Sequence, residues 1–266
     1  MIRVIVHAGF HKTGTSSLQL YFETHRRALG PWLSYYGKAD FPLAGTLART
    51  YAERPFAWRR RAFRHAFRQF LAPIPAAPMI VLSRETFAGV MPGHRNWLGR
   101  TVKGYAYSAV PICGEIRTEL MRRFGPDTQV EFLLTTRERE SWIRSVYGHL
   151  LRSIHLTEDY EAFRARLPAT LDLQHEAAEI ARQLSPVRVH VAALEDYGTC
   201  REGPAAALLD LAGVPLDLRN RLPPARRANS GQSPELMAAF LRMNREGHPK
   251  QDLKRRKDRM INERAS

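Results

Sequence analysis

The stretch HAGFHKTGTSS, from His7 to Ser17, decides how the chain folds around it. A run rich in β-branched residues at positions 2–8 leads into it and is typical of a buried strand. Apolar side chains with helical spacing follow at positions 16–28. A strand, a glycine-containing turn and a helix in this order form a phosphate cradle, because the backbone N–H groups of the turn and the positive end of the helix point at one anion. The stretch therefore predicts a phosphate site.

This turn offers both backbone and side-chain donors. Gly9 and Gly14 let the backbone approach a ligand closely or adopt a positive φ. Hydroxyl groups at the helix entrance add donors, and one lysine adds positive charge. We assign to the phosphate-binding set Gly9, Lys12, Thr13, Gly14, Thr15, Ser16 and Ser17.

A Walker A loop, G-x-x-x-x-G-K-[ST], is the main alternative for the turn. Gly9 and Gly14 have its spacing, but Thr15 stands where its lysine would be. Lys12 comes two residues before the second glycine, so it belongs to the turn and not to the helix start. That position suits a single phosphate and the group that leaves from it. Hydrolysis of ATP or GTP is therefore the weaker interpretation.

The rest of the chain alternates strands and helices. Further strands are expected at 79–83, 130–136 and 187–194, and further helices at 56–71, 112–124, from 137 onward, and at 159–167, 171–184, 203–212 and 234–245. Three stretches show no regular period and read as loops: 38–55, 88–111 and 215–233. Alternation of this kind predicts a single α/β domain with a central, mainly parallel sheet flanked by helices. We place this domain at residues 1–250 and a basic, frayed C-terminal tail at residues 251–266.

Composition is that of an ordinary globular protein with anionic partners. The 266 residues are 44% hydrophobic and 25% charged, and the formal net charge is +15. No run of 18 apolar residues occurs, so no transmembrane helix is expected, and the N-terminus turns polar too soon for a signal peptide. The two cysteines, Cys113 and Cys200, are expected as reduced thiols in the cytoplasm. Charge alone does not choose between a nucleotide, an acidic glycan, nucleic acid and a membrane surface.

Two separate motifs together resemble the sulfotransferases that use 3′-phosphoadenosine 5′-phosphosulfate (PAPS). The run GFHKTGTSSLQ is similar to the 5′-phosphosulfate-binding loop of their bacterial members, K-[ST]-G-T-[ST]-[ST]. In that family an arginine at a strand end and a serine eight residues later hold the 3′-phosphate. Here Arg137 ends VEFLLTT and Ser145 stands eight residues on. The resemblance implies a P-loop-like fold, PAPS as the donor and transfer of a sulfuryl group to an acceptor hydroxyl.

Two weaker similarities extend the match over most of the chain. They are Leu194-Glu195-Asp196-Tyr197 after the fourth expected strand and Arg227-Ala228-Asn229-Ser230 before the last helix. The resemblance implies that the second segment closes over the nucleotide, with Arg227 and Asn229 among the residues that bind it.

Sulfuryl transfer needs in-line geometry, a stabilised leaving group and a base for the attacking hydroxyl. Lys12 is the candidate that neutralises charge on the bridging oxygen as 3′,5′-diphosphoadenosine leaves. Glu85, directly after the second predicted strand, is the first candidate for the base, and His11 is its rival. No metal is expected, since the sulfuryl group carries less charge than a γ-phosphoryl group. HEAAE at 175–179 departs from the HExxH zinc motif at its last position.

The acceptor stays open between a carbohydrate, a lipid-linked sugar and a small molecule. The loop at 88–111, with His94, Trp97, Tyr105 and Tyr107, is expected to hold it. The helix at 56–71 turns Phe56, Phe63, Phe67 and Phe70 to the core, and its outer face carries the arginines Arg59, Arg60, Arg61, Arg64 and Arg68. Those arginines fit an acidic glycan, although such a face is more often only solvated.

Two other classes of function compete with the sulfotransferase. A P-loop phosphotransferase would need magnesium and ATP or GTP. A non-enzymatic binder of polyanions would rest on net charge alone and would show strongly salt-dependent affinity. No sequence-specific nucleic-acid partner is expected, and peripheral contact with a membrane stays open.

Overall fold

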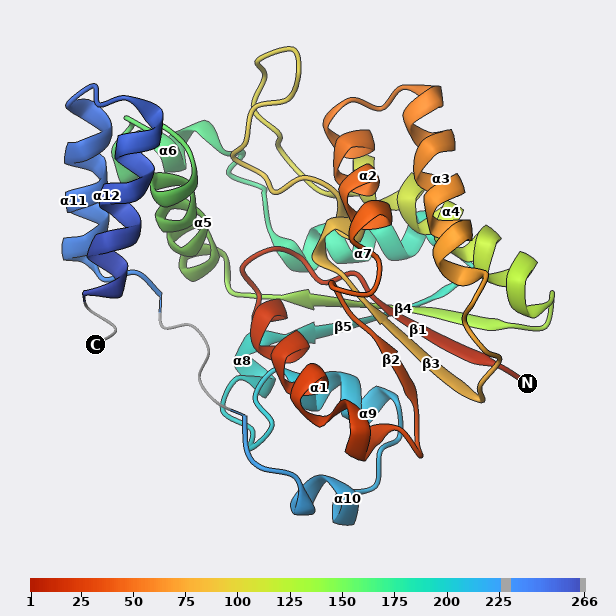
Figure 1. The fold of residues 1–266 in the computed structure, drawn as a ribbon. Coiled ribbons are helices and arrows are strands. Elements are labelled where there is room, and N and C mark those ends of the chain that lie inside the picture. Colours follow the sequence, from red (N-terminus) through yellow and green to blue (C-terminus); the bar gives the residue numbers. More distant parts are fainter. Residues whose placement is uncertain (226–230, 264–266) are drawn as a thin grey trace.

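A five-stranded sheet lies at the centre of the protein, and all of its strands run parallel (Figure 1). This computed structural model describes residues 1–225 and 231–263. The spatial order is β2-β3-β1-β4-β5. The strands are β1 (Arg3–His7), β2 (Ser34–Tyr36), β3 (Met79–Ser83), β4 (Gln129–Thr136) and β5 (Arg188–Ala193).

The strands are apolar on both faces because helices cover both. In β1, Val4 and Val6 point into one core and Ile5 into the other, and all three side chains are fully buried. One face packs against α2 (Pro42–Glu53), α3 (Ala57–Leu71), α4 (Ala106–Phe124) and α7 (Leu173–Leu184). The opposite face packs against α1 (Thr15–Leu29) and α9 (Ala205–Leu211) (Figure 1). The result is a three-layer α/β domain.

A group of helices lies beyond the carboxyl edge of the sheet, at the left of Figure 1. It comprises α5 (Arg139–Ser153), α6 (Tyr160–Arg166), α11 (Pro234–Arg245) and α12 (Lys250–Asn262). Short elements complete the chain: the 3₁₀ turn η1 (Glu85–Ala88) after β3, α8 (Leu194–Tyr197) after β5, and α10 (Leu216–Arg221). The β1–α1 turn opens at the same edge as the start of α5 (Figure 1). The carboxyl ends of β1 and β4 therefore meet where ligands bind in open α/β sheets.

The structure confirms the predicted fold class, and it corrects several elements. Four strands were expected, but a fifth, β2, pairs with β3 at the sheet edge. Residues 38–55, expected to be irregular, contain helix α2, which begins at Pro42. Proline is well suited to the first turn of a helix because its missing N–H would be unpaired there anyway.

One helix boundary and two unexpected helices also differ from the expectation. Helix α4 begins at Ala106 instead of near 112, with Pro111 inside it. The loop expected at 215–233 contains α10. The stretch after residue 250, expected to be frayed, forms α12 in its described part, where Leu253 and Lys257 are buried.

Helix α3 differs from the expectation on both of its faces. Phe63 and Phe67 are fully buried as expected, but Phe56 is exposed. The outer arginines are not simply solvated. Arg68 donates to both carboxylate oxygens of Glu119 at 2.8 Å, and Arg60 donates to Glu115 at 2.5 Å. Both glutamates lie on α4 and are buried, so this arginine face holds α3 against α4.

Candidate active site

The turn between β1 and α1 presents a row of unpaired backbone donors. Gly14 is the N-cap of α1, and no side chain caps this helix end. Within residues 1–225 and 231–263, no N–H group from Lys12 to Ser17 donates a hydrogen bond. Lys12 adopts φ 68°, a conformation uncommon for a residue with a side chain. Six consecutive N–H groups without a partner among the described residues, at the positive end of a helix, can bind an anion.

Close packing beneath the turn explains both of its glycines. A Cβ at Gly9 would lie 2.3 Å from Oγ1 of Thr135 and 2.4 Å from Nε2 of His7. Gly14 has φ 87°, and a Cβ there would lie 2.8 Å from the side chain of Pro204. The turn therefore lies directly on the strand ends, which leaves its N–H groups facing outward.

Residues of the β4–α5 segment hold two successive carbonyl groups of the turn. The indole Nε1 of Trp142 donates to the carbonyl oxygen of His11 at 3.0 Å. The Nη1 of Arg137 donates to the carbonyl oxygen of Lys12 at 3.4 Å. The buried Thr13 hydroxyl lies 2.6 Å from the Phe10 carbonyl oxygen, to which it donates. The side chain of Thr13 thus shapes the turn, and its backbone N–H is the part that faces a ligand.

Arg137 lies at the end of β4 beside the turn, where the sequence places it. Its Nε donates to the hydroxyl of Ser141 at 3.0 Å, which fixes the plane of the guanidinium group. Its Nη2 has no partner among the described residues. Ser145 lies one turn further along α5 and is half-buried. An arginine fork held at two of its nitrogens retains donors for a second anion.

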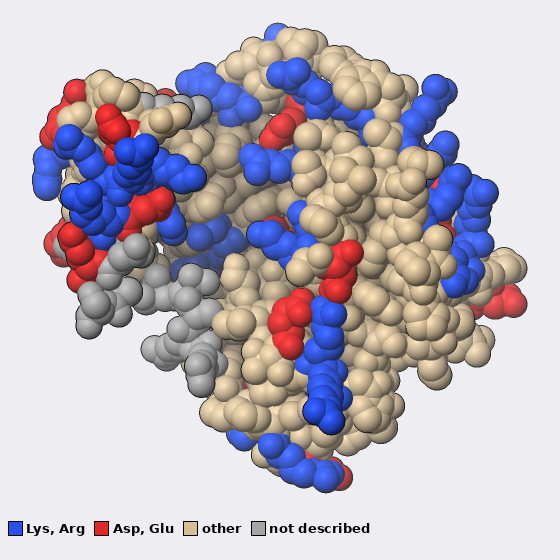
Figure 2. Space-filling view, in the orientation of Figure 1, with Lys and Arg blue, Asp and Glu red and all other residues tan. Residues whose placement is uncertain are grey.

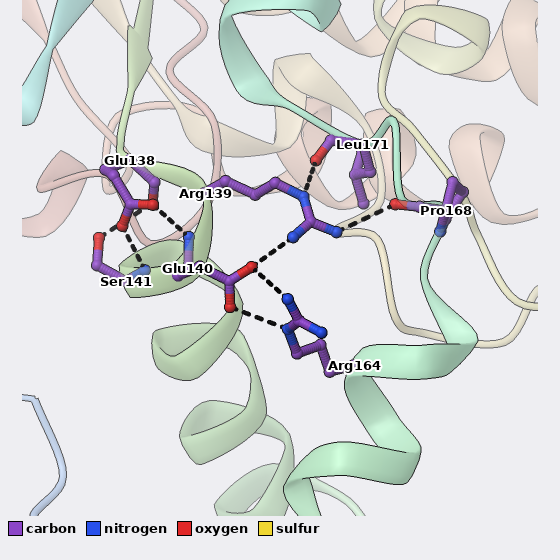
Figure 3. A network of polar contacts seen from close by, with 7 residues as sticks. All are labelled: Glu138, Arg139, Glu140, Ser141, Arg164, Pro168 and Leu171. Carbon is purple, nitrogen blue, oxygen red and sulfur yellow. Dashed lines mark hydrogen bonds and ion pairs between the residues drawn. The ribbon is translucent and has the colours of Figure 1, made fainter.

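The start of α5 is held rigid by the network in Figure 3. Glu138 caps the helix by accepting hydrogen bonds from the N–H groups of Glu140 and Ser141, both at 2.7 Å. Arg164 of α6 donates twice to Glu140 at 3.0 Å. Arg139 donates to Glu140 and to carbonyl groups in the 168–171 segment. This network fixes the backbone that directly follows Arg137.

Positive charge gathers around Lys12. Burial lowers the pKa of Lys12, and the neighbouring charges of Arg137 and Arg152 lower it further. Burial also lowers the pKa of His149 to about 4, with Lys12, His94 and Arg152 adding to the shift. On the same face, Figure 2 shows Lys and Arg side chains around a hollow between α5, α11 and α12 on one side and α2 and α3 on the other. A site of this kind attracts an anionic ligand.

Glu85 supplies a carboxylate at the edge of this positive region. Its Oε2 accepts a hydrogen bond from Nε2 of Gln19 at 3.1 Å, and its Oε1 lies 3.9 Å from Nζ of Lys38. Burial opposes ionisation, but the backbone N–H of Glu85, the nearby His11 and these two side chains lower its pKa below the ordinary value. Glu85 is therefore ionised at neutral pH and able to accept a proton.

His11 is fixed from one side by Tyr105. The phenol oxygen accepts a hydrogen bond from the backbone N–H of His11 at 3.2 Å and lies 3.3 Å from its Nδ1. Tyr105 is fully buried. Among the described residues, the Nδ1 of His11 is the acceptor that the phenol proton of Tyr105 can reach. The ring proton then sits on Nε2, so this tautomer makes His11 a donor at Nε2. Burial lowers the pKa of His11 to about 4.

The structure brings most of the predicted site residues together. The turn residues, Arg137, Ser145 and Glu85 all lie at the carboxyl edge of the sheet. Arg227 and Asn229 lie outside the described residues. Sequence reasoning missed Tyr105 as an anchor of His11, and it missed Gln19 and Lys38 as partners of Glu85. Gln19 lies one helical turn beyond Thr15, so its position on the same helix as the phosphate-binding turn could have been predicted. Nothing in the sequence indicates that Lys38 lies near Glu85.

Two features are absent from the part of the chain that the structure describes. No group of three or more His, Cys, Asp or Glu side chains is arranged to hold a metal ion in this part of the chain. None of the helices there is long and apolar enough to cross a membrane.

Comparison with known proteins shows similarity to solved structures. No family model matches the chain, and no curated protein sequence matches it. It is similar to the crystal structure of a sulfotransferase from Alicyclobacillus acidocaldarius, with 16% identity and a TM-score of 0.46 over 90% of this chain and 91% of that chain. It is also similar to the crystal structure of EHV4-TK complexed with TP4A, with 11% identity and a TM-score of 0.30 over 82% and 94% of the two chains. At these identities, the function has to be argued from the residues of this chain.

Proposed function

We propose that this protein is a sulfotransferase that moves the sulfuryl group of PAPS to an acceptor hydroxyl. The row of free N–H groups from Lys12 to Ser17 supports this proposal most directly. It offers one cradle for a 5′-phosphosulfate, and Arg137 beside it offers a second anion position. Two anions held on either side of a nucleoside match the 3′,5′ charge pattern of PAPS better than the linear phosphate chain of ATP.

The residues of the site suggest how the transfer proceeds. The acceptor oxygen attacks sulfur in line with the bond to the bridging phosphate oxygen, and that bond breaks as 3′,5′-diphosphoadenosine leaves. Lys12 offsets the negative charge that grows on the bridging oxygen. Glu85 takes the acceptor proton, because its carboxylate is ionised and the Nε2 of His11 carries a proton in the tautomer that Tyr105 favours. His11 then helps to orient the group that Glu85 acts on.

Calorimetric titration with 3′,5′-diphosphoadenosine, with ADP and with ADP plus magnesium tests this function. We expect the 3′-phosphorylated nucleotide to bind at least about tenfold more tightly, since it makes one additional charged contact. Tighter binding of ADP that depends on magnesium would indicate a phosphotransferase instead. Equal and weak binding of all three, lost at moderate salt, would indicate a binder of polyanions.

Turnover is the second part of the test. PAPS with a panel of carbohydrate, lipid-linked and small-molecule alcohols should release 3′,5′-diphosphoadenosine in the presence of the right acceptor class. Release that is independent of every acceptor would show hydrolysis and not transfer.

A further inference from the structure

A cluster of exposed aromatic side chains lies at one end of the molecule. Trp97 belongs to the loop between η1 and α4, whereas Phe56 and Trp58 belong to the α2–α3 connection and the first turn of α3. The ring centroids of Phe56 and Trp97 are 5.4 Å apart, and those of Phe56 and Trp58 are 6.4 Å apart. Trp58 is 61% exposed, Leu98 54% and Trp97 49%. Two segments some forty residues apart thus combine their apolar side chains on the surface.

The loop that carries Trp97 is a small, well-formed turn. Arg95 and Thr101 pair as an antiparallel bridge, and the N–H of Asn96 donates to the carbonyl oxygen of Arg100 at 2.8 Å. The Asn96 side chain accepts hydrogen bonds at 3.0 Å from the N–H groups of Leu98 and Arg100. Trp97 and Leu98 are therefore held at the tip of the turn in an exposed position, instead of folding back onto the core.

Cations surround this apolar cluster. Arg95 and Arg100 flank the tip, Lys103 follows it, and Arg54 precedes Phe56. All four are exposed, and Arg54, Arg100 and Lys103 form no ion pair within the part of the chain that the structure describes. At the top of Figure 2, uncharged side chains form the surface, with Lys and Arg side chains on both sides of them. The surface is thus apolar at its centre and cationic at its rim.

We propose that this surface, made of Phe56, Trp58, Trp97 and Leu98 with its rim of Arg54, Arg95, Arg100 and Lys103, docks on an anionic lipid bilayer. Tryptophan is favoured at the boundary between lipid headgroups and acyl chains, and unpaired lysines and arginines are attracted to anionic headgroups. A leucine at the tip of a rigid turn gains free energy in hydrocarbon, whereas a platform for sugars uses aromatic faces with polar partners. The chemistry therefore favours a membrane over a free glycan.

The same loop links this surface to the candidate active site. His94 immediately precedes Arg95, and its charge is close enough to lower the pKa of His149 and of His11. Binding to lipid needs no nucleotide, so vesicle binding can be tested independently of the proposed transfer reaction.

Sedimentation with sucrose-loaded vesicles tests whether this surface binds an anionic bilayer. We expect the full chain to bind vesicles that contain phosphatidylglycerol, to bind pure phosphatidylcholine far more weakly, and to dissociate as salt increases. The double variant R100Q/K103Q should bind about thirtyfold more weakly at low salt, since each cation near the surface contributes separately. The matched control K254Q/R255Q removes the same charge from exposed positions on α12 and should bind like the unmodified protein. An equal loss in both variants would overturn the proposal, because it would show attraction by net charge alone.

The apolar part of the surface has its own test. W97S/L98S should weaken vesicle binding by roughly tenfold, because it removes the side chains that enter the headgroup region. Both residues are exposed, so the circular dichroism spectrum and the affinity for 3′,5′-diphosphoadenosine should stay unchanged. Trp32, which is 46% exposed in the turn after α1, supplies the control W32S, which should bind normally. Unchanged binding of W97S/L98S, or an equal loss in W32S, would contradict the assignment.

Discussion

The guanidinium group of Arg137 holds the turn that carries Lys12, because its Nη1 donates to the carbonyl oxygen of that residue at 3.4 Å. The two cations are 125 positions apart in sequence, yet they lie at the adjacent ends of β1 and β4. Each lowers the energy of an anion placed between them, and each lacks an acidic partner among the described residues. This pairing of a turn and a strand end gives separate predictions for catalysis and for binding.

Substitution of Lys12 by alanine should abolish turnover and leave the fold intact. The half-buried side chain makes no hydrogen bond or ion pair among the described residues, and the charge it offsets develops mainly in the transition state. Steady-state rates and calorimetry on one preparation measure both effects. The affinity for 3′,5′-diphosphoadenosine should fall much less than the rate. A near-normal rate in Lys12→Ala would remove this residue from the mechanism.

Substitution of Arg137 by alanine should act on the 3′-phosphate. We expect a loss of about 1.5–3 kcal/mol in binding of 3′,5′-diphosphoadenosine, which is the range for hydrogen bonds to charged groups. Adenosine 5′-phosphosulfate has no 3′-phosphate and should lose much less. Ser145→Ala should shift the affinities in the same direction by a smaller amount. Equal losses for both nucleotides would show that Arg137 acts only by holding the turn through Lys12.

The sequence predicted the central layers of this fold but missed its shortest and least typical elements. β2 is three residues long, which is too short for a period of two to be recognised. Residues 38–55 show no regular period and predicted a loop, although Pro42 starts α2 there. In α12 a lysine takes a core position, since the Nζ of Lys257 donates to the carbonyl oxygen of Leu151 at 2.6 Å. A pattern that counts lysine as a solvent-facing residue cannot identify that helix.

The candidate site, like the fold, was predictable from the sequence only in part. Its backbone part was predictable because a glycine-containing turn between a strand and a helix has few uses, and Arg137 was proposed through the resemblance to the sulfotransferase motif. The supporting contacts were not predictable, because they join residues distant in sequence. Trp142 is fully buried, and its indole N–H also holds the carbonyl group of His11. Tyr105 was assigned to the acceptor loop, but it is buried beneath His11.

Substitution of Gly9 by alanine should destabilise the protein. The added Cβ would lie 2.3 Å from Thr135 and 2.4 Å from His7, and both of these buried side chains lie on strands that cannot move apart freely. Overpacking of this kind costs about 1–3 kcal/mol, measured as a lower midpoint of unfolding in denaturant. Gly114, in the middle of α4 with open space around it, gives the matched control. Gly114→Ala should raise stability by about 0.5–1 kcal/mol, and a destabilisation equal to that of Gly9→Ala would contradict the steric argument.

The buried Lys257 predicts how stability changes at alkaline pH. Burial lowers the pKa of its amine from 10.5 to about 8 in the folded protein. Between these two values the unfolded chain binds more protons than the folded one, so the free energy of unfolding should rise with pH over this interval. Below pH 8 the cost of the buried charge is constant.

Denaturant unfolding at several pH values from 7 to 10 measures this effect as the difference between the protein and Lys257→Met. Asn244 also donates to the Leu151 carbonyl oxygen, so that oxygen keeps a partner in the variant. The unmodified protein should gain stability relative to the variant as pH rises past 8. Lys254→Met, at an exposed position on the same helix, should show no such difference. Parallel curves for the protein and Lys257→Met would indicate that the amine titrates normally.

Substitution of Glu85 by glutamine distinguishes the two candidate bases. The amide keeps the shape of the side chain but cannot accept a proton, so the rate should fall by roughly 10²–10⁴-fold with nucleotide affinity nearly unchanged. The pKa of Glu85 is lowered from 4.5, and burial lowers that of His11 to about 4, so the acidic limb of the rate profile lies in a similar range for either base. The variant resolves this overlap, because the charge of Glu85 raises the pKa of His11. If Glu85 is the base, the acidic limb disappears in Glu85→Gln. If His11 is the base, the limb remains and moves to lower pH, and the rate falls only modestly.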